Sequence, residues 1–440
     1  MILVYSHKIT NRTKYIFRLI FIDILKTEVT FTENKTDFEV SNFPKINYSN
    51  HKTESGIFFK PSYLLFENGI KEQEIEVFEH KQNKCFFRVS SDSSMPFDVF
   101  AASFYLATRY EEYLPQIRDQ FDRFTASESL AYQQKFLKKP LINIWANEIA
   151  EIVKSHYPQF VFPERKFEYI STIDIDNAYA YKNKGIMRIV AGLLKALVKG
   201  NDFKQRVAVL LNKAKDPYDT YADQFEIHKK YNIKPIYFFL LGDYGFNDKN
   251  IPVKNQKFQA LIKSLADYYE VGIHPSYASN KEVSILIKEI TRLKNITHRD
   301  VKKSRQHFLK LTLPSTYRNL IDNDILEDFT MGYSGQPGFR ASICSPFYFY
   351  DLDIDKQTDL KIIPFAAMEA TFKYYLKATP QEAIKEINEL IDVVKLVNGT
   401  FVSVWHNESL SEQGLWKGWK EVYINVLEKA SSTPPKERLS

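Results

Sequence analysis

Apolar and polar residues alternate over short distances in the first 90 residues of the chain. Three short apolar stretches predict strands there, at residues 16–24, 56–59 and 75–78. From Pro96 the period becomes helical, because Phe97, Phe100 and Phe104 fall on one face and a proline suits a first turn. The pattern predicts an α+β domain at residues 1–160, ending in a proline-containing connection.

Beyond residue 166 the pattern alternates between strands and helices. Strands are predicted at residues 167–173, 235–241, 270–273 and 400–405, with helices at 257–269 and 282–293. A further helix has the clearest signals, because Thr379 and Glu382 form a capping box, Pro380 suits the first position and Gly399 stops it. Such alternation predicts a mainly parallel sheet or barrel with helices outside, which we place at residues 166–430.

Composition excludes several classes of protein. With 440 residues, of which 44% are hydrophobic and 15% aromatic, the chain is long and apolar enough for two folded domains. The net charge of +6 is spread widely, and no basic run with stacking aromatics predicts nucleic-acid binding. Cys85 and Cys344 make no disulfide framework, and no apolar run reaches the roughly 20 residues that span a bilayer. We expect a cytoplasmic protein.

Polar residues stand at the carboxyl ends of three predicted strands. Asp174 and Asp176 project to the same side if their strand stays extended. His274 follows a short strand, where Pro275 prevents a simple continuation of the ladder, and His406 follows the last strand. Because the carboxyl ends of parallel strands meet at one rim, we expect these side chains to converge.

Each of these residues has a chemical and a structural interpretation. Two carboxylates on one face repel unless a cation or proton lies between them, so one of Asp174 and Asp176 would bind metal while the other acts as a base. Alternatively, one caps the next helix and the other is solvated. His274 is either a metal ligand or a satisfied loop histidine. His406, with an ordinary pKa of about 6.5, suits the protonation of a leaving amine.

Over roughly residues 167–410 the sequence resembles the polysaccharide deacetylase family, also called carbohydrate esterase family 4. The resemblance rests on the Asp174/Asp176 pair, the Gly272-Ile-His274 element, Arg305 and His406. It implies an α/β fold, a distorted (β/α)7 barrel, with a divalent metal that is usually zinc. It also implies that Asp174 is the base, Asp176 and His274 are ligands, His406 is the acid and Arg305 orients Asp174.

The sequence departs from the family pattern at one metal ligand. The family commonly supplies a second histidine about four residues after the first, but position 278 is Ala and no histidine lies nearby. A catalytic zinc ordinarily has three protein ligands, so either another residue substitutes or the domain has lost its metal. His307 is the candidate substitute, on one face with Arg305 in an extended segment. Alternatively, His307 only packs beside Phe308.

A basic amphipathic segment is inserted at about residues 182–215. It combines apolar residues such as Leu193 and Leu197 with cations such as Arg188 and Lys195. One interpretation is a helical lid over the mouth of the barrel. The other is contact with an anionic membrane or a lipid-linked glycan.

The first domain resembles the domain that precedes deacetylase domains in certain bacterial surface-polysaccharide proteins. The motifs are Met95-Pro-Phe-Asp98, Arg109-Tyr-Glu-Glu-Tyr113 and Arg123-Phe124. No function follows from this resemblance, and we expect Arg109 and Glu112 to form an ion pair that serves folding. Arg340 either binds an anionic group of a substrate or forms a structural ion pair.

The first hypothesis is a zinc-dependent deacetylase that removes an N-acetyl or related acyl group from a sugar in surface-polysaccharide or lipopolysaccharide biosynthesis. Its metal ligands are Asp176, His274 and His307, and its catalytic residues are Asp174, His406 and Arg305. The second hypothesis is an inactive barrel that binds glycan without cleaving it. The expected partner is an N-acetylated sugar or glycan, free or lipid-linked, for a cytoplasmic protein or one peripheral to the inner membrane. The sequence leaves the sugar and the oligomeric state open.

Overall fold

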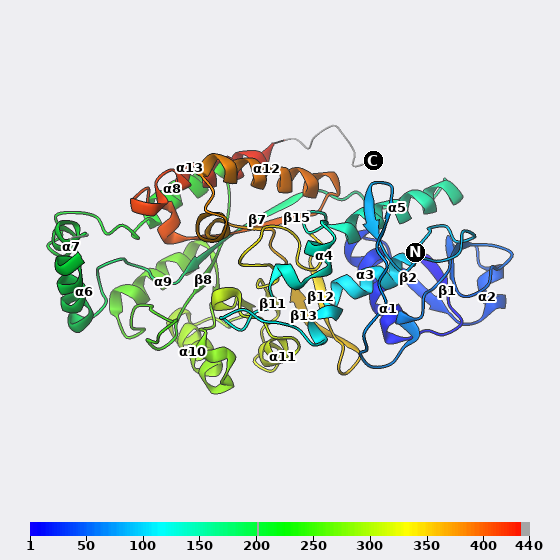
Figure 1. Ribbon diagram of the computed structural model, residues 1–440, viewed down its shortest axis with the longest axis horizontal. Coiled ribbons are helices and arrows are strands. Elements are labelled where there is room, and N and C mark those ends of the chain that lie inside the picture. The colour runs from blue at the N-terminus through cyan, green and yellow to red at the C-terminus, as the bar shows by residue number, and fades with distance from the viewer. Residues whose placement is uncertain (200–201, 433–440) are drawn as a thin grey trace.

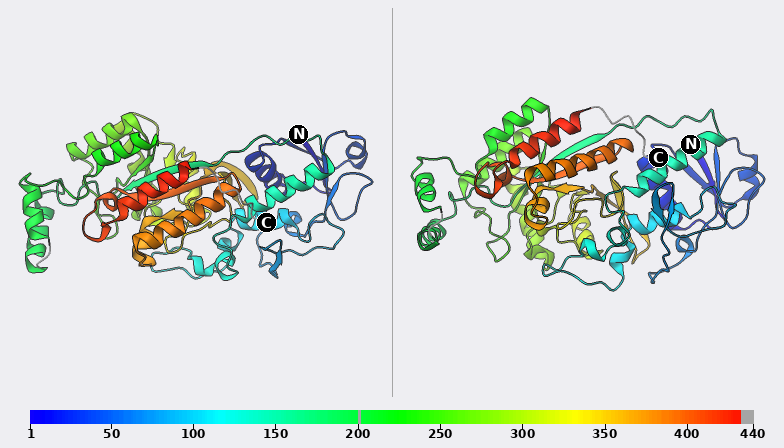
Figure 2. Two further views of the ribbon diagram at one scale, coloured as in Figure 1. Left: turned by 90° about the horizontal axis from the view of Figure 1, so that it is seen from above. Right: turned by 45° about the horizontal axis from the view of Figure 1, so that its top comes forward.

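A computed structural model describes residues 1–199 and 202–432 of the chain (Figure 1). Within them the strands form a four-stranded sheet, a nine-stranded sheet and a two-stranded hairpin. The two larger sheets follow one another along the long axis of the molecule, with helices packed around both (Figure 2). No helix in the described ranges is long and apolar enough to cross a membrane.

The N-terminal sheet has the order β2-β1-β3-β4 and is parallel throughout. Its strands are β1 (Ile2–Tyr5), β2 (Val29–Thr32), β3 (Lys45–Tyr48) and β4 (Ile57–Phe59). The helices of this part are α1 (Asn11–Arg18), α2 (Lys35–Val40), α3 (Val99–Ala107), α4 (Leu130–Gln133) and α5 (Leu141–His156). The hairpin consists of β5 (Phe78–His80) and β6 (Asn83–Cys85). The expectation of an α+β arrangement is therefore wrong for the sheet itself, which is of the parallel α/β type.

Two of the strands predicted in this part are also wrong. Residues 16–24 lie in α1 and in the π-helical stretch Leu19–Ile24 that follows it. These turns are buried on most sides, so their apolar residues show no one-sided helical period. The stretch 75–78 precedes β5 and reaches it only at its last residue. The strand at 56–59 and the helix beyond Pro96 are confirmed as β4 and α3, and Asp98 caps α3.

The larger sheet has the order β12-β13-β11-β10-β9-β8-β7-β15-β14, and within the described ranges only β12 is antiparallel to its neighbour. Its strands are β7 (Glu168–Ile175), β8 (Ile236–Phe239), β9 (Glu270–Ile273), β10 (Lys303–Ser304), β11 (Glu327–Asp328), β12 (Phe347–Asp351), β13 (Lys356–Ile362), β14 (Ala367–Met368) and β15 (Thr400–His406). The strands predicted at 167–173, 235–241, 270–273 and 400–405 are confirmed as β7, β8, β9 and β15.

The helices described around this sheet are α8 (Tyr221–Tyr231), α9 (Gln256–Tyr268), α10 (Val283–Thr297), α11 (Ser315–Ile321), α12 (Pro380–Leu396) and α13 (Trp419–Ser431). The predicted helices at 257–269 and 282–293 are confirmed as α9 and α10. The capping box of α12 is also present, because Thr379 accepts from the Glu382 N–H and Glu382 accepts from the Thr379 N–H.

The distorted (β/α)7 barrel that the resemblance implies is not confirmed, because the larger sheet does not close on itself. Among the described residues, β12 and β14 are its two ends and pair with no further strand. Since β14 has only two residues and β12 adds an antiparallel edge, no continuous ladder closes the ring. The sheet still encloses an inner apolar cluster that includes Phe238 from β8, Phe365 from the segment before β14 and Val404 from β15.

The two parts of the molecule share one core and a buried ion cluster. A continuous apolar cluster includes residues from β1 to α13, so the predicted domain division near residue 160 stays a prediction. Glu112 accepts from Arg109 Nε at 2.8 Å and from Arg340 Nη2 at 2.6 Å, and all three side chains are buried. The expected Arg109–Glu112 ion pair is confirmed, and Arg340 forms a structural ion pair.

The insert expected at 182–215 contains two helices, α6 (Ile186–Lys199) and α7 (Phe203–Leu210). Residues 200 and 201, between them, lie outside the described residues. The two helices project from the body of the molecule in all three views (Figures 1 and 2).

Candidate metal centre

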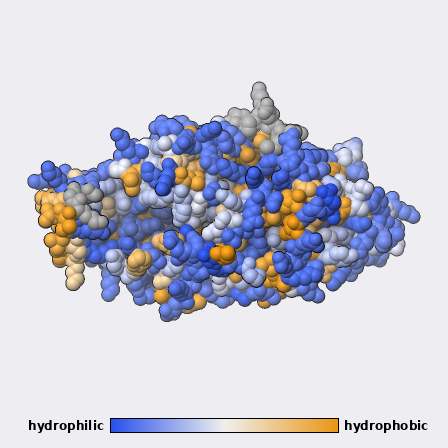
Figure 3. Space-filling view, in the orientation of Figure 1, coloured by the Kyte–Doolittle hydropathy of each residue, from blue (hydrophilic) through white to orange (hydrophobic). Residues whose placement is uncertain are grey.

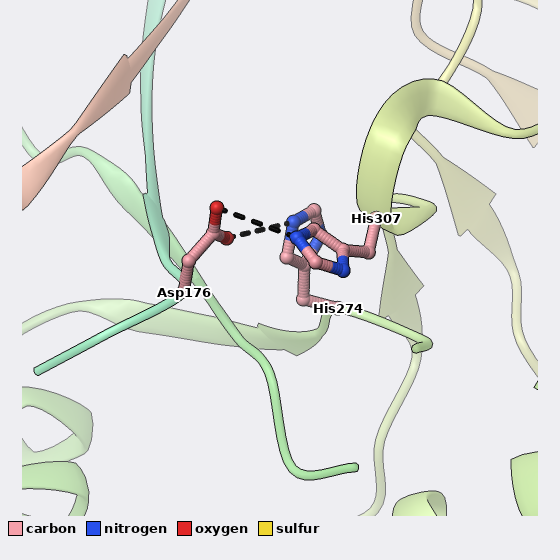
Figure 4. A group of neighbouring side chains, drawn as sticks. All are labelled: Asp176, His274 and His307. Atoms are coloured by element: carbon pink, nitrogen blue, oxygen red, sulfur yellow. Dashed lines mark ion pairs between the residues drawn. The ribbon is translucent and has the colours of Figure 1, made fainter. Parts of the chain in front are cut away.

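Three side chains with metal-ligating atoms converge near the carboxyl ends of three strands of the larger sheet (Figure 4). Asp176 comes directly after β7, His274 directly after β9, and His307 shortly after β10. One ligand atom from each lies within 4.8 Å of the others. Asp176 Oδ1 is 3.2 Å from His274 Nε2, and Asp176 Oδ2 is 3.4 Å from His307 Nε2.

These residues fit a divalent cation. Ligands held at about 2.0–2.2 Å from a tetrahedral zinc lie about 3.3–3.5 Å from one another, close to the two measured separations. Asp176 Oδ1 is buried and has no hydrogen-bond partner among the described residues. Its lone pairs are therefore open to a cation, as a ligand oxygen requires.

Both histidines are oriented through their other ring nitrogen. His274 Nδ1 lies 2.5 Å from the Arg305 carbonyl oxygen, and His307 Nδ1 lies 2.8 Å from Asp248 Oδ1. Because both acceptors require a proton on Nδ1, the Nε2 lone pairs face Asp176 in the neutral rings. Asp248 is itself held, since it accepts from the backbone N–H groups of Tyr277 and Ala278.

The charges of the site favour a positive species between these residues. Burial alone would raise the pKa of Asp176. The nearby histidines, first His307 and then His274 and His406, outweigh burial and hold this pKa well below its usual range. Burial lowers the pKa of His307, whereas Asp176 and Asp248 raise it to about 9. Asp176 and Asp248 therefore draw either a proton to His307 or a cation to the site, and the proton and the cation compete.

Asp174 lies beside this group, inside β7, with its carboxylate held by Arg305. Arg305 Nη1 donates to Asp174 Oδ1 at 2.9 Å and to Thr172 Oγ1 at 2.7 Å, and Nε donates to the Phe329 carbonyl at 3.0 Å. Both Asp174 and Arg305 are buried. Asp174 Oδ2, the other oxygen, lies 3.9 Å from His274 Nε2, so it borders the point where the three ligand atoms converge.

His406 approaches the same group from the end of β15, which lies on the other side of β7 from β9 and β10. Its Nε2 lies 3.9 Å from Asp176 Oδ2, and its Nδ1 lies 2.8 Å from Glu369 Oε1. Burial lowers the pKa of His406, but Glu369 and then Asp176 raise it well above the ordinary value. The ring therefore stays protonated near neutral pH, as a general acid must.

The chain turns sharply immediately after His307. Phe308 and Leu309 have φ values of 60° and 53°, a left-handed conformation that costs about 1–2 kcal/mol for a residue other than glycine. Arg123 Nη1 donates to the Phe308 carbonyl at 2.9 Å and is paired with Asp119. The N-terminal part of the chain thus supports the turn that carries a candidate ligand.

The site opens into a pocket of about 200 Å³. Five of the six residues predicted from the sequence line it, namely Asp174, Asp176, His274, His307 and His406, and Arg305 lies behind Asp174. A second pocket, of about 210 Å³, shares four lining residues with the first: Arg123, Leu309, Ser334 and Tyr375. The two pockets are therefore adjacent, and residues 119–132 of the N-terminal part line the second.

Asp248 and Glu369 were not predicted from the sequence, and Arg123 was predicted only as part of a motif of the N-terminal domain. Asp248 stands in a loop rich in Gly, Asn and Asp, a composition typical of a turn. Glu369 follows β14, a strand of two residues that no apolar pattern in the sequence predicts. For Asp248 and Glu369 the only local signal is a carboxylate close to a turn or strand end. Many solvated acidic residues have the same signal.

Comparison with known proteins gives one family match and several similar folds. A profile described as a family of unknown function (DUF7033) matches residues 2–158. None of the curated proteins matches the chain.

Solved structures similar to this chain include a Mycobacterium smegmatis protein assigned as a polysaccharide deacetylase, with 15% identity and a TM-score of 0.40 over 61% of this chain and 86% of that one. The polysaccharide deacetylase Bc1974 from Bacillus cereus has 12% identity and a TM-score of 0.29, over 60% of this chain and 88% of that one. BA3943, a CE4 family pseudoenzyme from Bacillus anthracis, has 12% identity and a TM-score of 0.30, over 60% and 62%. At these identities and TM-scores the similarity supports no conclusion about activity or substrate.

Proposed function

We propose that the chain is a metal-dependent deacetylase that hydrolyses an N-acetyl or related acyl group on a sugar. The observation that carries this proposal is the convergence of Asp176, His274 and His307 beside Asp174 and His406 at one pocket. A ligand group, a buried carboxylate and a protonated imidazole are the three parts that amide hydrolysis needs.

Asp176, His274 and His307 would hold the cation, and zinc suits their nitrogen and oxygen atoms. When bound, such an ion supplies Lewis acidity towards the acyl carbonyl and towards water. His307 would provide the third ligand that Ala278 cannot. This substitution favours the enzyme over an inactive glycan-binding protein, the second hypothesis.

The remaining residues divide the proton transfers between them. Asp174, fixed by Arg305, accepts a proton from the attacking water through the carboxylate oxygen that faces the site. His406, fixed by Glu369, gives its proton to the departing amine nitrogen. One proton is taken from water and one is given to nitrogen, so the acyl group leaves as a carboxylic acid and the sugar as an amine.

The pocket also has the lining expected for a sugar. Its walls combine aromatic side chains, Tyr374, Tyr375 and Trp416, with polar ones such as Gln306. Aromatic faces pack on the apolar faces of sugar rings while polar groups take their hydroxyls. We place the reaction in surface-polysaccharide or lipopolysaccharide assembly on the sequence resemblance alone, and zinc as the metal on the ligand set.

The test combines metal analysis with acetate release. Purified full-length protein stripped by chelator, then reloaded with zinc, should release acetate from N-acetylglucosamine oligomers only when reloaded. Asp174→Asn should keep stoichiometric zinc and lose about 10²–10⁴-fold in rate, because it removes a base but no ligand. A protein that holds no metal yet binds the oligomers would contradict the proposal and favour the inactive glycan-binding protein.

A further inference from the structure

The projecting helices α6 and α7 carry an apolar surface that the rest of the molecule does not cover. Six apolar side chains of α6 are exposed: Ile186, Met187, Val190, Leu194, Leu197 and Val198. Figure 3 shows the apolar patch at the same end of the molecule. Contiguous exposed apolar surface of this kind marks an interaction site in a protein that folds in water.

The exposed residues form one face of α6. At 100° per residue they fall within a sector of about 120°, and Lys195, which is exposed, lies beyond its edge, at about 180°. The opposite side of the helix packs on α7, where Gly192 lies against Arg206. The helix therefore has an apolar outward face, a basic flank and a protein-facing side.

Lys and Arg are spread along the whole chain, but their excess over Asp and Glu arises in the same segment. Residues 182–215 contain nine Lys and Arg and a single acid, Asp202, whereas the remaining residues contain 51 Lys and Arg and 53 Asp and Glu. The segment thus has a net charge of +8 and the rest of the chain −2, which accounts for the total of +6. An apolar face flanked by cations is complementary to an anionic lipid surface.

The helices do not line the candidate metal pocket. Among the described residues that line this pocket, none comes from residues 182–215. Arg188 instead donates to the backbone carbonyls of Lys249 and Asn250, at 2.8 and 2.9 Å. These two residues directly follow Asp248, which holds His307.

We propose that α6, supported by α7, lies on an anionic lipid bilayer with its apolar face in the interface. A second copy of the chain is less suited to cover this apolar face, because the excess positive charges of the two copies would repel each other. Arg188 connects α6 to the loop that contains Asp248. Docking of α6 on the bilayer would therefore keep the candidate metal pocket near the lipid surface. The proposal does not depend on deacetylase activity.

Vesicle sedimentation of the full-length protein tests the proposal. Vesicles of phosphatidylcholine with phosphatidylserine should pellet the protein, and vesicles of phosphatidylcholine alone should pellet it much less. The double variant Leu194→Asp/Leu197→Asp should bind at least about tenfold more weakly, because two apolar anchors become anionic. Lys195→Ala should cost roughly fivefold, the effect of one cation near the surface.

Val161→Asp is the matched control, since Val161 is 81% exposed outside the segment. It should bind as the wild type does. Equal pelleting of wild type and double variant, or no pelleting of the wild type by anionic vesicles, would overturn the proposal. A wild-type dimer in sedimentation velocity that the double variant disrupts would overturn it too, because the face would then belong to a second copy.

Discussion

Replacing Asp248 by Asn tests how the candidate metal centre is held together. Asp248 Oδ1 lies 2.8 Å from His307 Nδ1 and also accepts from the Tyr277 N–H, while Oδ2 accepts from the Ala278 N–H. Asparagine keeps the shape and one oxygen acceptor but removes the negative charge. The substitution therefore tests the influence of this charge on His307 while leaving the three proposed ligands in place.

The expected loss of zinc affinity follows from the hydrogen bond between residue 248 and His307, which becomes neutral in the variant. A hydrogen bond to a charged group contributes about 1.5–3 kcal/mol and a neutral one about 0.5–1.5, so the change costs about 1–2 kcal/mol. This corresponds to zinc binding that is about 5- to 30-fold weaker, in line with the 10–100-fold effects typical of such partners of metal-bound histidines.

The assay is competition for zinc against a chromophoric chelator near pH 7.5, with circular dichroism as a check on folding. Asp243→Asn is the matched control, because Asp243 lies in the same loop but is exposed and pairs with Lys288 and Arg292. Asp243→Asn should bind zinc as the wild type does. If a folded Asp248→Asn protein binds zinc within about twofold of the wild type, the carboxylate does not support the ligand and the reasoning is refuted.

Three further predictions concern buried carboxylates. Glu369→Gln removes the charge that raises the pKa of His406, so the alkaline limb of kcat/KM should move to lower pH; an unmoved limb would exclude this role. Glu112→Ala leaves Arg109 and Arg340 buried without their shared partner and should cost about 3–5 kcal/mol in urea denaturation, whereas a loss under about 1 kcal/mol would contradict the inference. Burial raises the pKa of Glu289 to about 7. Because this folded-state pKa exceeds the unfolded one, neutral Glu289 stabilises the folded protein fully below about pH 4, and this stabilisation is lost as pH rises through 7. The free energy of unfolding of Glu289→Gln should therefore rise by up to about 3 kcal/mol relative to the wild type between pH 4 and pH 8. A constant difference in unfolding free energy between the two proteins would contradict this prediction.

The positions at strand ends were predictable because topology alone determines them. Once a parallel sheet is inferred, Asp174, Asp176, His274 and His406 must approach one rim whatever the details of packing. His307 was predictable only as a substitute, because the loss of a ligand at Ala278 required another histidine. The structure brings His307 to 3.4 Å from Asp176, and its role as a ligand stays a proposal.

The other parts of the site and of the fold depend on tertiary contacts that leave no local pattern in the sequence. Asp248 and Glu369 lie 59 and 37 residues from the histidines they hold, and nothing in their own segments predicts these pairings. The apolar run at Leu19–Ile24 was misassigned because burial on most sides removes the one-sided period that distinguishes a helix. The distorted barrel implied by the resemblance is not confirmed, because the sheet ends at β14, a strand of two residues, and at the antiparallel β12.

Anomalous diffraction from zinc-soaked crystals, measured on both sides of the zinc absorption edge, tests the central claim most directly. The account predicts one strong peak about 2 Å from Asp176, His274 Nε2 and His307 Nε2. A crystal with no peak among these three residues, or with its only strong peak elsewhere, would contradict it.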